Sequence, residues 1–371
     1  MTPKERVKAA LNHQEPDRVP VGEFATDYKI IEAVLGRETF YRGKTKEIKA
    51  LWDGRRDEVV ESQKKDLVEF IRKTNTDMVP VQMVPARNAV FEKPKQIDEN
   101  TYKDQFGNVL RYSEATQDMM LMERGSKAPN AIEQPPPDGS EWELFDYVVE
   151  QLGETHYIFA RNAGGAPTVG YPCALGITER MIRIAEDPDG VAEGKLKSVQ
   201  NFGERVKLAL DRGADAFCCG EDFGHTGGPF VSPATFRKVF FPALKAQCEQ
   251  IKAAGSPVLF HSCGNLKLIL DQMVEAGVDC YQAIQEGEPL DEYKRTYGDR
   301  LTLWGGVLTH TLSTGTPDDV RREARFSVKH CAPGGGFILG SSHSLIISTR
   351  YDNYMAMLDV AHKEGTYPIQ I

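Results

Sequence analysis

Apolar and polar positions along the chain alternate between short apolar runs and longer amphipathic segments. Apolar runs of about four to seven residues indicate strands, and amphipathic segments of about ten to twenty residues between them indicate helices. Because neighbouring parallel strands need a helical crossover, this alternation predicts a parallel sheet. The candidate strands span residues 19–24, 78–81, 157–160, 168–170, 214–222, 257–260, 279–284, 301–307 and 336–340.

Several helical segments begin with a capping residue followed by proline. Thr2, Ser232 and Thr316 each precede a proline at the first helical position, where the missing N–H costs nothing. Roughly eight strand–helix units predict an α/β chain folded as a (β/α)8 TIM barrel with an N-terminal helical segment. No G-x-G-x-x-G follows an early strand, which counts against a dinucleotide-binding sheet. The expected helices span residues 3–11, 29–35, 57–74, 191–212, 233–254, 266–276, 290–297, 317–330 and 350–363.

Residues 86–125 depart from this alternation. Within them, residues 101–112 alternate apolar and polar side chains around Gly107-Asn108, as the two arms of a hairpin do. We therefore predict a β-hairpin insertion at about 86–125 within a single domain of residues 1–371.

Polar side chains collect directly after five successive predicted strands. In a TIM barrel the strands' C-terminal ends meet at one mouth, where the active site lies. These positions therefore predict a functional site. The residues are Glu221, Asp222 and His225, then His261 and Cys263, then Gln285 and Glu286, then His310, and finally Ser342, His343 and Ser344.

His261 and Cys263 are the centre of this predicted site. In an extended segment, residues two apart point to the same face, so an imidazole and a thiol stand side by side. Zinc takes these ligands, and a catalytic zinc has three protein ligands plus an open position. Glu221 and His343 are the alternative third ligands. The alternative is that His261 and Cys263 bind no metal and are ordinary side chains at the end of a buried strand.

The remaining polar residues receive other roles. Glu221 or Asp222 completes the coordination or transfers a proton as the catalytic group. Cys218 and Cys219 lie inside an apolar strand, so we expect them to pack in the core. His225, Gln285, His310 and Ser342 are expected to contact the substrate.

Composition narrows the class of protein. Hydrophobic residues make up 40% and charged residues 27%, as in soluble globular proteins. A net charge of -9 without a basic stripe argues against nucleic acid as a partner. No stretch approaches the roughly 20 apolar residues of a membrane span. An amphipathic N-terminal segment and seven scattered cysteines lead us to expect a cytoplasmic location.

Five motifs in order give the chain a family resemblance. They are GEDFG at 220–224, GPFVSP at 228–233, FHSCGN at 260–265, WGGV at 304–307 and GGGFIL at 334–339. Together with PKERV at 3–7 and PDRVP at 16–20, they make the chain resemble the uroporphyrinogen decarboxylase superfamily, and within it the corrinoid-dependent methyltransferases. The resemblance implies a TIM barrel with zinc held by the His-x-Cys pair and a later cysteine. Here His343 falls nearest the place of that cysteine.

The resemblance implies a zinc-dependent methyltransferase. It would move a methyl group from a small methylated substrate, with methoxylated aromatics favoured, to the cobalt of a corrinoid (cobalamin) on a separate partner protein. A homodimer is a further expectation for this chain. One alternative is a uroporphyrinogen-type decarboxylase that uses carboxylates and His343, although residues 19–27 lack the arginines that would grip its substrate. The other is a non-catalytic accessory protein that binds the metal or the corrinoid.

Overall fold

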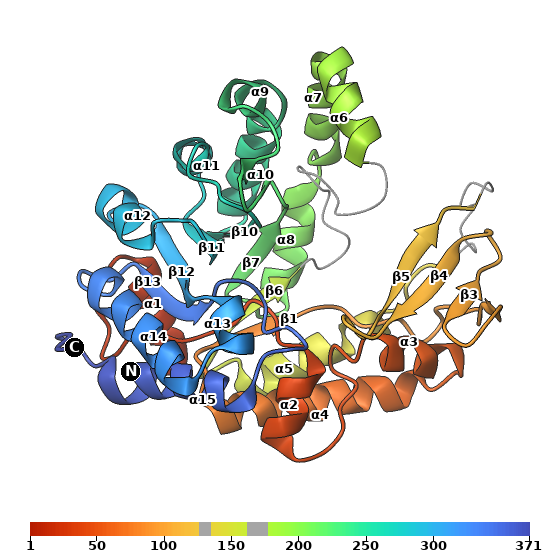
Figure 1. The fold of residues 1–371 in the computed structure, drawn as a ribbon, viewed down its shortest axis with the longest axis horizontal. Helices are drawn as coiled ribbons and strands as arrows, with labels where there is room; N and C mark the ends of the chain where they lie inside the picture. The colour runs from red at the N-terminus through yellow and green to blue at the C-terminus, as the bar shows by residue number, and fades with distance from the viewer. Residues whose placement is uncertain (126–134, 162–176) are drawn as a thin grey trace.

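Seven strands form one parallel sheet, each hydrogen-bonded to the next in the order β1-β6-β7-β10-β11-β12-β13 (Figure 1). The computed structural model describes residues 1–125, 135–161 and 177–371. In a (β/α)8 barrel, strands that are consecutive along the chain are also neighbours in the sheet, and this order has that pattern. Their bounds are Met78–Val81 (β1), Tyr157–Arg161 (β6), Ala216–Gly220 (β7), Val258–His261 (β10), Cys280–Ile284 (β11), Thr302–Val307 (β12) and Phe337–Ser341 (β13).

Residues 19–23 occupy the eighth place, between the two ends of this sheet. Val21 pairs with Leu339 of β13 in a parallel bridge, and the N–H of Asp77, just before β1, donates to the Val21 carbonyl over 2.7 Å. The predicted TIM-barrel fold is thereby confirmed, with its first strand reduced to a bridge. The candidate strand at 168–170 lies outside the described residues.

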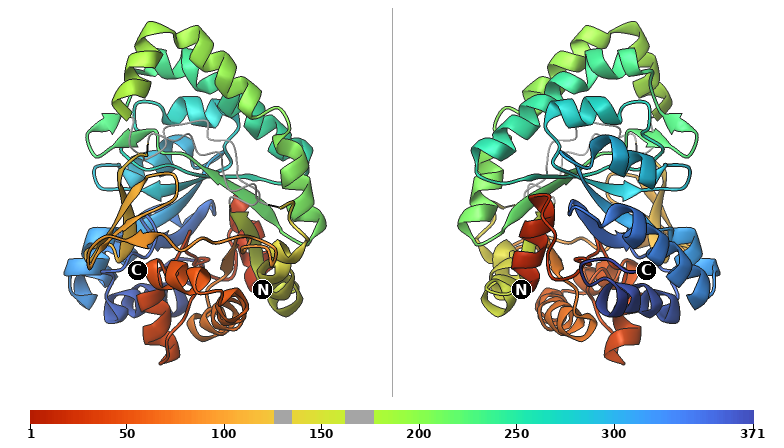
Figure 2. Two further views of the ribbon diagram at one scale, coloured as in Figure 1. Left: turned by 90° about the vertical axis from the view of Figure 1, so that its right-hand side faces the viewer. Right: turned by 90° about the vertical axis from the view of Figure 1, so that its left-hand side faces the viewer.

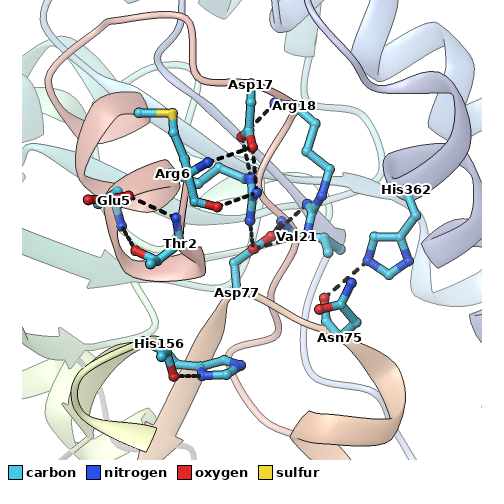
Figure 3. A network of polar contacts seen from close by, with 12 residues as sticks. Thr2, Glu5, Arg6, Asp17, Arg18, Val21, Asn75, Asp77, His156 and His362 are labelled. Atoms are coloured by element: carbon cyan, nitrogen blue, oxygen red, sulfur yellow. Dashed lines mark hydrogen bonds and ion pairs between the residues drawn. The ribbon is translucent and has the colours of Figure 1, made fainter.

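A buried carboxylate fixes this first segment in place (Figure 3). Asp77 accepts hydrogen bonds from Arg6 over 2.6 Å, from Arg18 over 2.8 Å and from the Val21 N–H over 2.8 Å. Asp17 holds Arg6 from the other side over 2.7 Å. The buried Arg6 and the half-buried Arg18 surround one fully buried carboxylate and compensate its desolvation. The charged residues of the two N-terminal motifs therefore serve the fold.

The barrel interior is filled by the inward-facing residue of each strand. Because side chains alternate along a strand, one layer above this filling the inward positions are Arg161, His261 and Gln282. The filling comprises Met78, Tyr157, Phe159, Ala216, Cys218, Leu259, Cys280, Trp304 and Ile338, closed below by Val7 and Ala10 of α1 (Pro3–Leu11). Cys218 and Cys219 are both buried, as expected for packing residues.

Helices lie on the outside of the parallel sheet (Figure 2). Within the described part of the chain, none is long and apolar enough to cross a membrane. Besides α1 the α-helices are Tyr28–Leu35 (α2), Thr45–Trp52 (α3), Arg56–Thr74 (α4), Glu143–Leu152 (α5), Ile177–Glu186 (α6), Pro188–Ser198 (α7), Phe202–Asp211 (α8), Pro233–Val239 (α9), Phe241–Ala253 (α10), Leu270–Ala276 (α11), Leu290–Tyr297 (α12), Thr309–Thr314 (α13), Pro317–Cys331 (α14) and Tyr351–Asp359 (α15).

Two predicted long helices are each broken in the structure. The helix expected over 191–212 is two helices, α7 and α8, because the Gln250 amide binds the carbonyl of Val199 over 2.7 Å and the N–H of Gly203 over 3.0 Å between them. The helix expected over 233–254 is interrupted at Phe240. Pro242 has no N–H to continue the hydrogen-bond ladder there.

The insertion forms a four-stranded antiparallel sheet rather than a single hairpin. The expected hairpin is confirmed, since Thr101 pairs with Arg111 and Lys103 with Val109. Figure 1 shows the sheet standing off to one side of the barrel. Its strands are Lys95–Gln96 (β2), Thr101–Lys103 (β3), Val109–Ser113 (β4) and Asp118–Glu123 (β5).

Candidate functional site

His261, Cys263 and His343 meet at the C-terminal mouth of the barrel. His261 ends β10, Cys263 follows it by two residues, and His343 lies two residues past the end of β13. One ligand atom from each lies within 4.8 Å of the others. The Cys263 Sγ is 3.5 Å from His261 Nε2, and the two imidazole rings meet edge to face at 5.3 Å. Two imidazoles and a thiol at this spacing are a donor set that suits zinc.

Gln282 orients this donor set from behind. Its amide oxygen accepts from the His261 Nδ1, so that Nε2 carries the lone pair on the side of the Cys263 sulfur. Its amide nitrogen donates to the backbone carbonyl of His343 over 3.1 Å. Such outer-shell bonds fix the tautomer and ring direction of metal-binding histidines. The fully buried Gln282 therefore ties two of the three candidate ligands together, and these residues fit a zinc ion.

The environment of His261 and His343 favours the neutral form of both imidazoles. Burial lowers the pKa of His261, and repulsion from His343 lowers it further. Burial also lowers the pKa of His343, against the attraction of Asp222. A metal binds the neutral imidazole, so burial removes the competing proton at neutral pH.

The loop carrying Cys263 is held by its neighbours' side chains. Asp222 accepts the Cys263 N–H over 3.1 Å, and Gln285 accepts the Gly264 N–H over 3.0 Å. Gly264 has φ +99°, and a Cβ there would lie 2.2 Å from the backbone of Gly224. This turn therefore requires glycine.

The other predicted site residues lie outside the three-residue cluster. Glu221 is buried beside it, and its N–H donates to the His261 carbonyl over 2.9 Å. His225 is exposed and accepts from the Gly227 N–H. His310 is exposed in α13 beside Thr314, whereas Ser342 is buried and accepts from the Thr309 N–H over 2.9 Å. None of these four placements tests a role in substrate binding or catalysis.

Three residues at the mouth went unnoticed in the sequence: Gln282, Phe24 and Arg161. The Phe24 ring stacks on His261 with centroids 4.2 Å apart and planes 6° apart. Gln282 gave a usable signal, because it is an amide inside an apolar strand. Arg161 gave another, because it directly follows the apolar run 157–160 at a predicted strand end.

Glu23 anchors the loop that carries His343. Both of its carboxyl oxygens lie 3.2 Å from the Ser341 N–H, and one contacts the Ser341 hydroxyl. That hydroxyl donates to the His343 carbonyl over 2.6 Å. Burial raises the pKa of Glu23 to about 8, so at pH 7 the folded protein holds this carboxyl protonated.

We expect Glu23→Gln to flatten the pH dependence of folding. The unfolded chain ionises Glu23 above about 4.5, but the folded protein keeps the proton up to about 8. The carboxyl's contribution is therefore complete below pH 4.5 and declines as pH rises to 8. Between pH 4.5 and 7 the ionisation of Glu23 in the unfolded chain lowers the wild type's free energy of unfolding by on the order of 3 kcal/mol. Urea unfolding at several pH values measures this. Parallel curves for the two proteins would contradict the expectation.

Gln282→Leu should weaken zinc binding while the fold persists. The change keeps the side-chain volume but removes the partner of His261 Nδ1 and of the His343 carbonyl, and lost outer-shell bonds cost about 10–100-fold in metal affinity. Competition against a chromogenic chelator measures the Kd. Gln272→Leu, a buried amide bonded to Pro233 over 3.0 Å, is the matched control. Equal Kd values for both variants would exclude the orienting role.

The model of the family described as uroporphyrinogen decarboxylase (URO-D) matches residues 177–364, just over half of the chain. The chain belongs to this family. The matched segment contains His261, Cys263, Gln282 and His343.

Two curated relatives are methyltransferases by name. The methylated-thiol–coenzyme M methyltransferase of Methanosarcina mazei is 23% identical over 179 residues, covering 48% of this chain and 42% of that protein. The methylcobamide:CoM methyltransferase MtaA of Methanosarcina barkeri is 26% identical over 130 residues, covering 34% of this chain and 36% of that protein. The matches thus span less than half of these relatives.

A solved methyltransferase from Methanosarcina mazei shares the fold. It aligns with a TM-score of 0.65 over 98% of this chain and 99% of its own, at 16% sequence identity. At this identity the likeness supports the barrel and says nothing of the substrate.

Proposed function

We propose that this chain is a zinc-dependent methyltransferase that moves a methyl group between a small methylated substrate and the cobalt of a separate corrinoid protein. The observation that carries the proposal is the His261–Cys263–His343 cluster with one ligand atom of each within 4.8 Å of the others. Membership of the uroporphyrinogen decarboxylase family and the two methyltransferase relatives support the same reaction class.

Zinc held by these three residues would act as a Lewis acid on the heteroatom that carries the methyl group. The chain's own residues prepare that site. Gln282 holds His261 in the required tautomer, and Phe24 covers one face of the imidazole. Asp222 holds the backbone of Cys263 and is, with Glu221, our candidate for managing a proton.

The decisive experiment measures methyl transfer to free cob(I)alamin by absorbance. Zinc-loaded protein is offered methoxylated aromatics, methylamines, methylated thiols and methanol in parallel. Formation of methylcobalamin with one class supports the proposal and identifies the methyl donor. No transfer from any class, together with loss of carbon dioxide from a porphyrinogen, would instead favour the decarboxylase that the family's name describes.

A further inference from the structure

Arg161 brings a cation to the same mouth as the cluster. It is the last residue of β6 and shares its inward direction with Phe159, two residues earlier. Its guanidinium carbon lies 4.8 Å from the centre of the Phe24 ring, whose centre lies 4.2 Å from that of the His261 ring. These two steps put the guanidinium within about 9 Å of the imidazole.

Most of the guanidinium's donors have no acceptor among the residues that the structure describes. One nitrogen donates to the Gln82 side chain over 3.0 Å and the other to the Phe24 carbonyl over 3.4 Å. A guanidinium has five N–H groups, so three lack a protein acceptor in the described part of the chain. Free donors of a planar fork match the two oxygens of a carboxylate or sulfonate.

No carboxylate neutralises Arg161 among the described residues. Asp27 attracts it at longer range but is already bound by Arg42 over 2.9 Å and by Lys44 over 3.3 Å. Residues 162–176, which follow Arg161, contain no Asp or Glu. A largely buried cation that no carboxylate among the described residues neutralises is costly to keep, so its retention favours a negative charge from outside the chain.

The electrostatic state of Arg161 agrees with this. Burial and, to a smaller extent, repulsion from Arg42 together lower its pKa to about 10. The guanidinium is nevertheless protonated at pH 7. An anion placed against it would meet the three donors that have no acceptor among the described residues, and a positive field from both arginines.

We propose that Arg161 binds the carboxylate or sulfonate of the small molecule whose sulfur or oxygen faces His261, Cys263 and His343. This inference rests on the proposed function and narrows it: the methyl donor or acceptor is a small organic anion. A span of up to about 9 Å between guanidinium and imidazole suits one benzene ring or a three-carbon chain between the two groups.

Three thiols that differ only at the far end test this by calorimetry on zinc-loaded protein. They are 3-mercaptopropionate, 3-mercaptopropanesulfonate and the neutral 3-mercaptopropan-1-ol. In the wild type we expect at least one anionic thiol to bind 10-fold or more tightly than the alcohol, as a charged hydrogen bond gives. Comparing the two anions separates a carboxylate substrate from a sulfonate substrate.

The variants assign that preference to Arg161. Arg161→Gln should bring the anionic thiols to within about twofold of the alcohol while the alcohol's own Kd stays unchanged. Arg161→Lys should keep part of the preference, because the charge remains without the fork. Arg237→Gln is the matched control, since Arg237 also lies over an aromatic ring, that of Phe241, but is exposed and paired with Glu275.

Two results would overturn the inference. One is a wild type that binds all three thiols equally, and the other is an Arg161→Gln variant that weakens all three alike. Failure of the zinc site is a separate result, because metal analysis detects it directly. In that event metal-free protein is titrated with propionate and propanesulfonate. Binding that Arg161→Gln reduces supports the inference, and either no binding or binding that this variant does not reduce overturns it.

Discussion

His261→Ala and Cys263→Ala should each remove zinc from the protein and abolish methyl transfer. The cluster supplies three ligand atoms within 4.8 Å of one another, and each substitution leaves only two. Losing even an outer-shell partner costs about 10–100-fold in metal affinity, so losing a ligand should cost more than about 100-fold. Metal analysis after dialysis gives the zinc content, and cob(I)alamin methylation gives the activity.

Cys218→Ala is the matched control for Cys263→Ala. Cys218 is also a thiol inside the barrel, but it packs one layer below the mouth among Phe159, Leu259 and Trp304. Its loss should cost some stability and no zinc. Full zinc content in Cys263→Ala would exclude Cys263 as a ligand, and zinc loss in Cys218→Ala would point to a general packing effect.

The barrel was predictable from the sequence because its strands are short apolar runs with clear boundaries. The apolar runs that became β1, β6 and β10–β13 matched their predicted positions closely, and Thr2-Pro3 and Thr316-Pro317 began their helices as expected. The broken helices were not predictable in the same way. The break at Val199 depends on Gln250, a residue some fifty positions away that contacts it only in the folded chain.

In the candidate site too, the residues that follow a local sequence rule were predictable, and those that depend on contacts in the folded chain were not. His261 and Cys263 were found because a local rule, the two-residue period of a strand, puts them on one face. Gln282, Phe24 and Arg161 act through contacts between segments that are far apart in the sequence. The pairing of Gln282 with His261 follows from the register of β10 against β11, in which the two residues are direct partners. Sequence periodicity predicts a strand but not its neighbour's register.

The third ligand is where two predictions competed, and a pair of variants separates them. His343→Ala should lose zinc, whereas Glu221→Gln should keep it. His343 contributes a ring nitrogen to the cluster, which does not include Glu221. The Glu221→Gln change also keeps the shape of a buried side chain. Zinc content of the two purified variants is the measurement.

His343→Cys sharpens the test, because the family resemblance implies a cysteine near this place. A thiolate is a zinc ligand in its own right, so this variant should retain one zinc per chain. Cobalt(II) substitution should then show stronger sulfur-to-cobalt charge-transfer absorption than in the wild type, since two sulfurs replace one. Zinc retained in His343→Ala but lost in Glu221→Gln would reverse the assignment and make Glu221 the ligand. In that case the cobalt(II) spectrum of His343→Cys should equal that of the wild type, because residue 343 would not contact the metal.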